Sequence, residues 1–254
     1  MKISVITVCW NSSATIGDTI ASFLAQRHAD KELLVVDGQS TDDTVNIARA
    51  YNAPSIRIIS ERDKGPFDAM NKGLRLYSGE AVGVLNSDDT FHDDLALTRI
   101  AAGLADADIV YGDLDFVSDH RTKTVMREWR AGEFRRGLFR TGWMPPHPTF
   151  YARRAVLDRV GEFDISYRAT ADYDLMLRAM ELNDFRIRYI PQILADFQLG
   201  GISTRNWRAT IDGNLECLRA RRIHLGAPPV DAALFLRPLR KLFELRRLRG
   251  YYKG

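Results

Sequence analysis

The sequence predicts an α/β fold, with a mainly parallel, Rossmann-like sheet covered by helices on both faces and a helical extension at the C-terminus. Short apolar, β-branched runs alternate with amphipathic helical patterns through the first half of the chain. These runs are continuously apolar, which is typical of strands buried on both faces. Polar clusters rich in Asn, Asp and Ser end most of them, at the edge where ligands of such sheets bind.

The expected elements follow one another in order through residues 1–112. The strands are expected at Ile3–Val8, Leu33–Val36, Ile56–Ile59, Ala81–Leu85 and Asp108–Gly112. The helices are expected at Ile16–Leu24, after the acidic capping segment Ser40–Asp43, at Phe67–Tyr77 and at Leu95–Leu104. Asn, Asp and Ser also end strands and cap helices for purely structural reasons, so Asn11 and Asp42 keep that alternative.

The second half of the chain is less regular. A strand at Thr122–Trp129 is expected to pair with Leu114–Val117, and helices are expected at Ala171–Leu182 and from Trp207 to Arg222. Pro145–Pro148 predicts a rigid, extended connection, because a residue before proline is kept out of the helical region.

Composition places the chain among ordinary globular proteins. Of its 254 residues, 45% are hydrophobic and 27% are charged. No apolar run reaches the roughly 18–20 residues needed to span a bilayer. The N-terminal run Ile3–Trp10 meets Asn11 at once, unlike a signal peptide. The two cysteines, Cys9 and Cys217, predict no disulfide framework and favour a reducing cytoplasm.

Charge is distributed unevenly along the chain. The net charge is +3, yet the last twenty residues hold seven lysines and arginines against one glutamate, so the rest is slightly acidic. Leu234–Leu248 places apolar residues broadly on one side of a basic helix, a pattern typical of helices on an anionic membrane surface. A helix packed on the preceding domain is the alternative. No recognition motif favours nucleic acid as a partner.

The motifs exclude several chemistries. The sequence has no Walker-type phosphate loop, no Gly-x-Ser-x-Gly elbow and no zinc-spaced Cys/His set. The first strand–helix turn, Trp10–Ser13, lacks the glycines of a nicotinamide or flavin site, and also those of a sugar-1-phosphate nucleotidyltransferase. Carboxylates at strand ends remain. They suit Mg²⁺ or Mn²⁺, which usually bind one or two carboxylates together with substrate phosphates, so a nucleoside diphosphate ligand is expected.

The motifs together resemble the family 2 glycosyltransferases, which have the glycosyltransferase-A fold. The resemblance covers residues 1 to about 205, and its stretches are Thr7–Asn11, Val35–Asp42, Asp63–Gly65, Asp68–Gly73, Leu85–Asp89, Gly161–Asp164 and Ala171–Leu175. It implies a catalytic domain at 1–205, with a nucleotide-binding half (1–112) and an acceptor half (113–205), before a basic extension at 206–254. The stretch 63–73 resembles the subset that builds bacterial exopolysaccharides of the colanic-acid type.

The resemblance also implies a role for each matched residue. Thr7 and Asn11 would border the nucleotide, and Asp37 would receive the uracil or ribose. Asp63 and Lys64 would be the next nucleotide contacts. Asp88 would bind the metal, with Asp89 beside it, and His147 would lie near the diphosphate or the acceptor. Asp172 would be the catalytic base. Asn86 replaces the first acid of the family's Asp-x-Asp motif, and Ala171 stands where many members carry an acid.

The implied activity is a metal-dependent, inverting transfer of a sugar from a nucleotide-diphosphate sugar, UDP-linked in most such enzymes, to a glycan or polyprenyl-diphosphate-linked acceptor. The processive members' Gln-x-x-Arg-Trp motif is absent, since Leu-Gly-Gly follows Gln198, which favours one sugar per event. A catalytically silent subunit that binds nucleotide sugars is the alternative. Asp172 has a purely structural alternative as a helix N-cap, and Gly200–Thr204 is either a loop closing over phosphates or an ordinary connection. The enzyme is expected in the cytoplasm, at the inner face of the plasma membrane.

Overall fold

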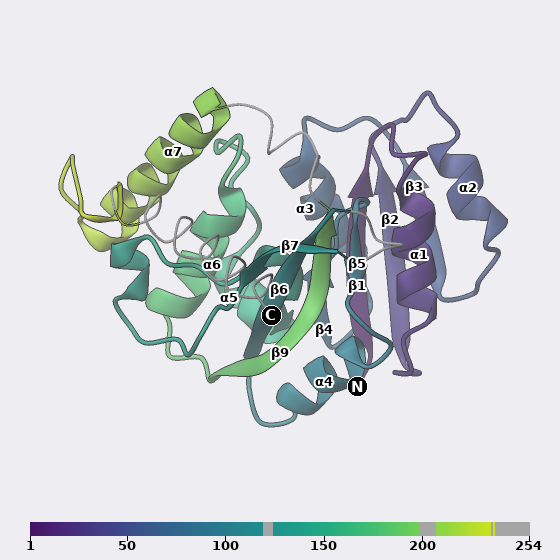
Figure 1. The fold of residues 1–254 in the computed structure, drawn as a ribbon, viewed down its shortest axis with the longest axis horizontal. Coiled ribbons are helices and arrows are strands. Elements are labelled where there is room, and N and C mark those ends of the chain that lie inside the picture. Colours follow the sequence, from purple (N-terminus) through teal and green to yellow (C-terminus); the bar gives the residue numbers. More distant parts are fainter. Residues whose placement is uncertain (119–123, 199–206, 235, 237–254) are drawn as a thin grey trace, which may run out of the picture.

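The computed structural model describes residues 1–118, 124–198, 207–234 and 236. Within them, nine strands form one curled sheet in the order β3-β2-β1-β4-β8-β6-β9-β5, with β7 paired to β6 (Figure 1). The strands are β1 (Ile3–Cys9), β2 (Lys31–Asp37), β3 (Ile56–Ser60), β4 (Ala81–Val84), β5 (Asp89–Phe91), β6 (Ile109–Val117), β7 (Val125–Trp129), β8 (Tyr151–Arg153) and β9 (Ile187–Gln198). The helices are α1 (Ile16–Leu24), α2 (Thr44–Ala50), α3 (Pro66–Leu76), α4 (Ala96–Gly103), α5 (Arg154–Val160), α6 (Ala171–Glu181) and α7 (Trp207–Leu225), with 3₁₀ turns η1 (Leu138–Thr141) and η2 (His147–Thr149).

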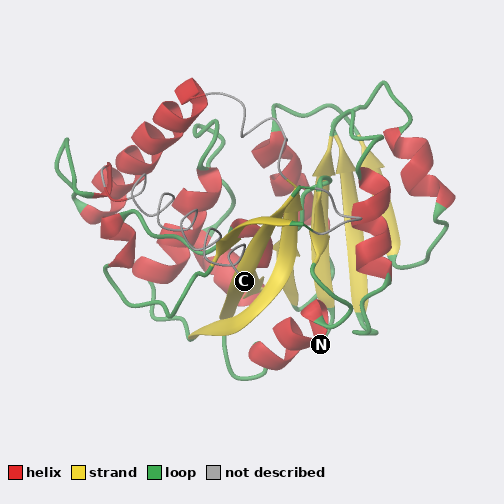
Figure 2. Cartoon of the chain, in the orientation of Figure 1, coloured by secondary structure: helices red, strands yellow, loops and turns green. Residues whose placement is uncertain are grey.

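The first four strands form a purely parallel unit, as the sequence predicts. Side chains of successive residues point to opposite faces, so Val5 packs into one core cluster and Ile6 into the other. Helices α1, α2 and α4 contribute to the cluster that contains Val5, whereas α3, α5 and α6 contribute to the other. Figure 2 shows these helices on the two sides of the sheet. The expectation of a sheet covered on both faces is therefore confirmed.

The second half of the sheet is mixed. Strand β8 is antiparallel to both β4 and β6, whereas β9 runs parallel to β6 and antiparallel to β5. The description "mainly parallel" therefore holds for the N-terminal half alone. The expected boundary between the halves, at residue 112, falls inside the continuous strand β6.

Some elements differ from the expectation. The expected strands at 108–112 and 114–117 are one strand, β6, and β7 pairs with its second part as predicted. Pro146 is extended, but the next three residues form the turn η2 instead of an extended connection. The short elements β5, β8 and α5, and the long strand β9, are not anticipated by the sequence patterns.

Helix α7 confirms the expected helix after residue 206 and packs against α6. Most of the predicted basic helix, and the whole of the Gly200–Thr204 segment, lie outside the described residues. No helix among the residues that the structure describes is long and apolar enough to cross a membrane.

Candidate functional site

The carboxyl ends of the first parallel strands meet at one edge of the sheet. Cys9 at the end of β1 is in register with Asp37 of β2, which is in register with Ser60 of β3. Strand β4 pairs with β1 up to Val84, two residues before Asn86. The predicted nucleotide-binding segments that follow these strands therefore start from a common edge, as the sequence argument requires.

Asp37 lies at the centre of this edge and is fully buried. Its Oδ2 accepts hydrogen bonds from the Ser40 N–H at 3.0 Å and the Ser60 hydroxyl at 2.6 Å. Its Oδ1 accepts from the Ser40 hydroxyl and, at 3.7 Å, from the Cys9 thiol. Burial, with the charge of Asp37 adding to it, raises the pKa of that thiol. The carboxylate therefore organises the loop after β2, and its predicted contact with the base or ribose stays a prediction.

Asp63 lies against the backbone of Gly38. A Cβ at position 38 would come within 2.5 Å of Asp63 Oδ2, so the glycine leaves the space that this carboxylate occupies. The other oxygen, Oδ1, accepts the Gly65 N–H at 2.8 Å. The half-buried Asp63 thus stands directly beside the end of β2, whereas the adjacent Lys64 is exposed. The predicted nucleotide contacts of Asp63 and Lys64 stay predictions.

Asn11 joins the loops that follow β1 and β2. Its side-chain oxygen accepts the Thr41 N–H at 2.9 Å, and its own N–H donates to Ser40 Oγ at 2.8 Å. Its φ of 50° lies in the left-handed region, which asparagine tolerates better than most residues. Asn11 is therefore a structural link at this edge. The preceding Trp10 is 62% exposed, although the strand before it is buried.

Thr7 supports the segment that contains the acidic pair. The Thr7 side chain is fully buried, and its hydroxyl donates to the Leu85 carbonyl oxygen at 2.7 Å. This bond ties β1 to the chain immediately before Asn86. Thr7 therefore holds the backbone of Leu85, which precedes the predicted site residues Asn86 and Asp88.

The structure separates the two adjacent acids of the Asn86–Asp89 segment. Asp88 is half-buried, whereas Asp89 is fully buried at the start of β5. Asp89 Oδ2 accepts from Asn86 Nδ2 at 3.1 Å, and Asp89 Oδ1 receives no hydrogen bond. Burial, with the charge of Asp88 adding to it, raises the pKa of Asp89 well above its usual range. Asp88 is thus the acid of the pair that reaches solvent.

This arrangement fits a cation that arrives with its substrate. Within the described part of the chain, no three His, Cys, Asp or Glu side chains form a metal-binding group. One partly accessible carboxylate, Asp88, suits a magnesium or manganese ion that takes its other ligands from substrate phosphates and water. The buried Asp89, which the sequence resemblance pairs with it as a ligand, is held by Asn86 in this structure.

Asp172 and His147 come together from distant parts of the sequence. Asp172 lies in the first turn of α6, and its Oδ1 accepts the Tyr173 N–H at 2.8 Å. The N-cap position belongs to Thr170, so the alternative of Asp172 as the cap is wrong. Burial lowers the pKa of the His147 imidazole, and the nearby charge of Asp172 partly opposes this effect. The His147 ring also meets the Phe163 ring edge-on, with centroids 5.8 Å apart.

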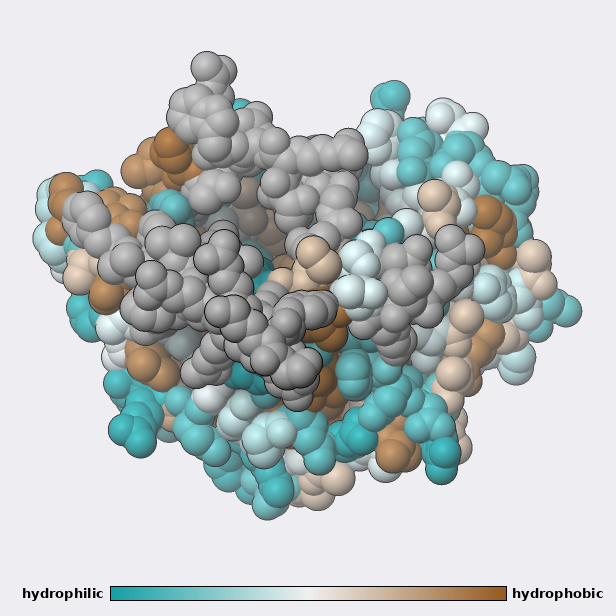
Figure 3. Space-filling model, viewed as in Figure 1, coloured by the Kyte–Doolittle hydropathy of each residue, from teal (hydrophilic) through white to brown (hydrophobic). Residues whose placement is uncertain are grey.

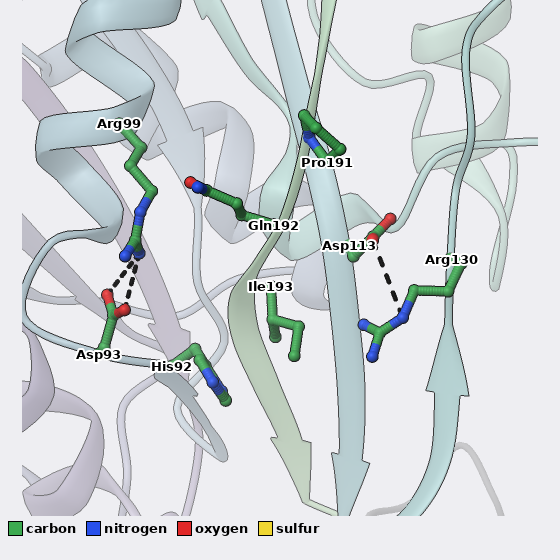
Figure 4. Close-up of a pocket in the computed structure, with 8 residues that line it drawn as sticks. All are labelled: His92, Asp93, Arg99, Asp113, Arg130, Pro191, Gln192 and Ile193. Carbon is green, nitrogen blue, oxygen red and sulfur yellow. Dashed lines mark hydrogen bonds and ion pairs between the residues drawn. The ribbon is translucent and has the colours of Figure 1, made fainter. Parts of the chain in front are cut away.

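A polar cavity of about 420 Å³ lies elsewhere, beside the irregular pairing of β6 with β9 (Figure 4). Arg99 Nη1 binds both oxygens of Asp93 at 2.7 Å, and Arg130 Nε lies 3.9 Å from Asp113. None of the predicted site residues lines this cavity.

A comparison with sequence models of protein families shows which family the chain belongs to. The sequence model of "Glycosyl transferase family 2" matches residues 4–161. The chain belongs to this family. The family 2 glycosyltransferase is also 32% identical over 208 residues to a PGL/p-HBAD biosynthesis glycosyltransferase of Mycobacterium tuberculosis, covering 79% of this chain and 78% of the relative. It is 31% identical over 195 residues to the succinoglycan biosynthesis protein ExoO of Rhizobium meliloti, covering 70% and 55% of the two chains.

Solved structures confirm the glycosyltransferase-A fold. The S. aureus TarS structure of residues 1–349 superposes on this family 2 glycosyltransferase with a TM-score of 0.70 at 22% identity, covering 100% of this chain and 75% of TarS. The mannosyltransferase PcManGT of Pyrobaculum calidifontis, solved with GDP-Man and Mn²⁺, gives a TM-score of 0.63 at 18% identity, covering 100% and 76%. The predicted family, fold class and enzyme class are therefore confirmed.

Some residues within the matched motifs were assigned no role from the sequence. Exposed Trp10 is one; its signal is an aromatic residue placed directly after an apolar strand. Asn71 is another, since it lies in a matched motif but bonds to the backbone of Phe163. Contacts of α7 with the segment before α6 have no sequence signal, because they join residues that are far apart in the chain.

Proposed function

We propose that this enzyme transfers one sugar per event from a nucleotide-diphosphate sugar to a glycan or lipid-linked acceptor, with inversion at the anomeric carbon. The observation that carries the proposal is the position of Asp172 in the first turn of α6, near enough to His147 for its charge to oppose the lowering of the histidine pKa. The turn η2, which carries His147, packs on β4. This turn thus adjoins the strand that leads to the candidate phosphate-end acid, Asp88.

The proposed chemistry is a single displacement. The acceptor hydroxyl attacks the anomeric carbon while the bond from that carbon to the diphosphate oxygen breaks. Asp172 takes the hydroxyl proton, a role typically worth about 10²–10⁴ in rate. Burial lowers the pKa of His147, which favours a neutral imidazole near the proposed base.

UDP is the proposed nucleotide, and Asp37, Asp63, Lys64 and Asn11 are its proposed surroundings. The solved structures of TarS with UDP-GlcNAc and with UDP support this nucleotide, and PcManGT with GDP-Man marks GDP as the competing one. Trp10, exposed at the same edge, is proposed to stack on the base.

A divalent cation held by Asp88 would neutralise the charge that builds on the departing diphosphate. The partial accessibility of Asp88 and the full burial of Asp89 support a single carboxylate contact to this ion. The Mn²⁺ in the PcManGT structure supports the choice of metal.

The acceptor is proposed to lie at the inner membrane surface, reached through the basic C-terminal segment. A relative named for succinoglycan biosynthesis supports a polysaccharide-building role. Helix α7 exposes the apolar side chains of Ile211, Leu215 and Ile223, and Figure 3 shows apolar surface over α7 at its upper left. These side chains would add apolar area to a basic surface segment.

A thermal-shift screen tests the donor assignment. UDP, GDP, dTDP, UDP-GlcNAc and GDP-mannose are each added with and without Mn²⁺. We expect UDP and UDP-GlcNAc to raise the melting temperature only when Mn²⁺ is present. We also expect the enzyme to release UDP slowly from UDP-GlcNAc. Metal-independent binding without any release would instead favour a silent nucleotide-sugar-binding subunit.

For the membrane proposal, the full chain is expected to sediment with anionic vesicles at low salt, and a chain ending at Val230 to remain in the supernatant.

A further inference from the structure

The segment that leads into α6 is held from outside by one carboxylate of α7. Glu216 Oε1 accepts the Arg168 N–H at 2.8 Å. Glu216 Oε2 accepts the N–H groups of Ala169 at 3.0 Å and Thr170 at 3.1 Å, and also the Thr170 hydroxyl at 3.1 Å. A single side chain therefore receives four hydrogen bonds from three consecutive residues.

Arg168 and Ala169 precede α6, and Thr170 is its N-cap, so no intrahelical carbonyl accepts these three N–H groups. The first N–H groups at a helix start have no intrahelical acceptor. Thr170 occupies the N-cap position of α6 but makes no side-chain cap bond to that helix. Its hydroxyl is instead directed to Glu216. The conformation of the chain two residues before Asp172 is thus set by α7.

Helix α7 also holds the two residues that follow Asp172. Arg221 is fully buried and donates from Nη1 to the Tyr173 hydroxyl at 3.2 Å. His224 Nε2 lies 2.8 Å from Asp174 Oδ1. Helix α7 therefore holds the chain on both sides of Asp172. It binds Tyr173 and Asp174 on one side and residues 168–170 on the other.

We propose that Glu216 is a positioning residue for the general base Asp172. The proposal rests on the proposed function, because it assumes that Asp172 accepts the proton of the attacking hydroxyl. A displacement of about 1 Å in a reacting group is enough to slow a reaction about 10²-fold. Loss of the Glu216 contacts frees the start of α6, so the position of the Asp172 carboxylate is no longer fixed. The nucleotide edge, which belongs to other strands, is unaffected.

A double-mutant cycle tests this role. UDP release from UDP-GlcNAc with Mn²⁺ is measured for the wild type, Glu216→Ala, Asp172→Asn and the double variant, with GDP-mannose as the probe if only GDP binds. We expect Glu216→Ala to lower kcat at least about 10-fold, within the range for a misplaced group, with an unchanged dissociation constant for UDP. In the Asp172→Asn background the same change is expected to have no further effect, because the two residues act as one unit.

Two controls keep the outcome decisive. Asp212→Ala removes an exposed carboxylate from the same helix and is expected to leave kcat unchanged. Glu216→Gln keeps one acceptor oxygen and is expected to fall between the wild type and Glu216→Ala; it replaces the alanine variant in the cycle if that variant fails to fold. Amide hydrogen exchange at residues 168–170 is expected to accelerate in Glu216→Ala.

The possible failures are distinguishable. If Asp172→Asn leaves kcat unchanged, the base assignment of the proposed function is wrong, and the role of Glu216 falls with it. If Asp172→Asn lowers kcat and Glu216→Ala lowers it further by the same factor as in the wild type, Asp172 remains the base and the positioning role is wrong. An unchanged kcat in Glu216→Ala, with faster exchange at 168–170, also overturns the positioning role.

Discussion

The Asn71 side chain and the Phe163 backbone exchange two hydrogen bonds of 2.9 Å each. Asn71 Nδ2 donates to the Phe163 carbonyl, and the Phe163 N–H donates to Asn71 Oδ1. Asn71 is buried in α3, whereas Phe163 precedes α6 and meets the His147 ring. This pair therefore fastens α3 to the segment between α5 and α6.

Replacement of Asn71 is expected to destabilise the protein strongly. Asn71→Leu leaves the Phe163 N–H and carbonyl without partners, at about 1–3 kcal/mol for each buried group. We expect the free energy of unfolding to fall by about 2–6 kcal/mol in urea titrations. Asn46→Ala, at a surface position of α2, serves as the control and is expected to change it by less than about 0.5 kcal/mol. Equal effects of the two changes would contradict the bracing role of Asn71.

Asp88→Ala is expected to abolish metal-dependent transfer while the fold survives. The charge of Asp88 raises the pKa of buried Asp89, so its removal relieves repulsion and stability holds or rises slightly. The measurements are the thermal shift caused by UDP with Mn²⁺ and UDP release. Asp106→Ala, which breaks an exposed ion pair with Arg188, is the control. Undiminished Mn²⁺-dependent turnover in Asp88→Ala would refute the metal assignment.

Asp172→Asn is expected to bind the donor normally and to turn over at least about 10²-fold more slowly, the lower range for a lost general base. The fold is expected to survive because the asparagine oxygen still accepts the Tyr173 N–H. Single-turnover rates and UDP affinity are compared with the wild type. A kcat within a few-fold of the wild type would mean that Asp172 only supports the first turn of α6.

Trp10→Ala is expected to weaken UDP binding without lowering stability. Stacking of a base on an aromatic ring is worth about 1–3 kcal/mol, equivalent to roughly 5- to 150-fold in the dissociation constant. The 62% exposure of Trp10 leaves little packing to lose. Calorimetric titration with UDP measures the change, and Trp10→Phe is expected to retain most of the affinity. If the alanine variant binds UDP as tightly as the wild type, the base lies elsewhere.

His147 is expected to make stability depend on pH. Burial lowers the pKa of its imidazole, so the unfolded chain binds the proton more readily than the folded one. The resulting stabilisation is complete above the unfolded pKa of about 6.5 and is lost as the pH falls toward the lowered native value. The difference in unfolding free energy between the wild type and His147→Gln is therefore expected to shrink from pH 7 to pH 5. If this difference stays constant or grows as the pH falls, burial of His147 does not stabilise the neutral imidazole.

The sequence by itself determined the parallel half of the fold. Strands β1, β2 and β4 are largely buried on both faces, so each carries a continuous apolar run, and the polar residues after each run mark the ligand-binding edge. Motif order then sufficed to predict the family and the enzyme class. The strands β5, β8 and β9 were missed because two of them have three residues and β9 contains Pro191. Gly112 does not end β6, since Leu194 fills the space beside it.

Only the tertiary structure decided how the polar residues divide their roles. Asp88 and Asp89 are equivalent as neighbours in the sequence, but the pairing of β5 with β9 buries one carboxylate and leaves the other at the surface. Asp37 likewise became a buried acceptor once its loop closed over it. The meeting of His147 with Asp172, and of Glu216 with the start of α6, depends on packing between distant segments. Local patterns of apolar and polar residues encode which face of an element is buried, but they do not encode which distant side chain it meets there.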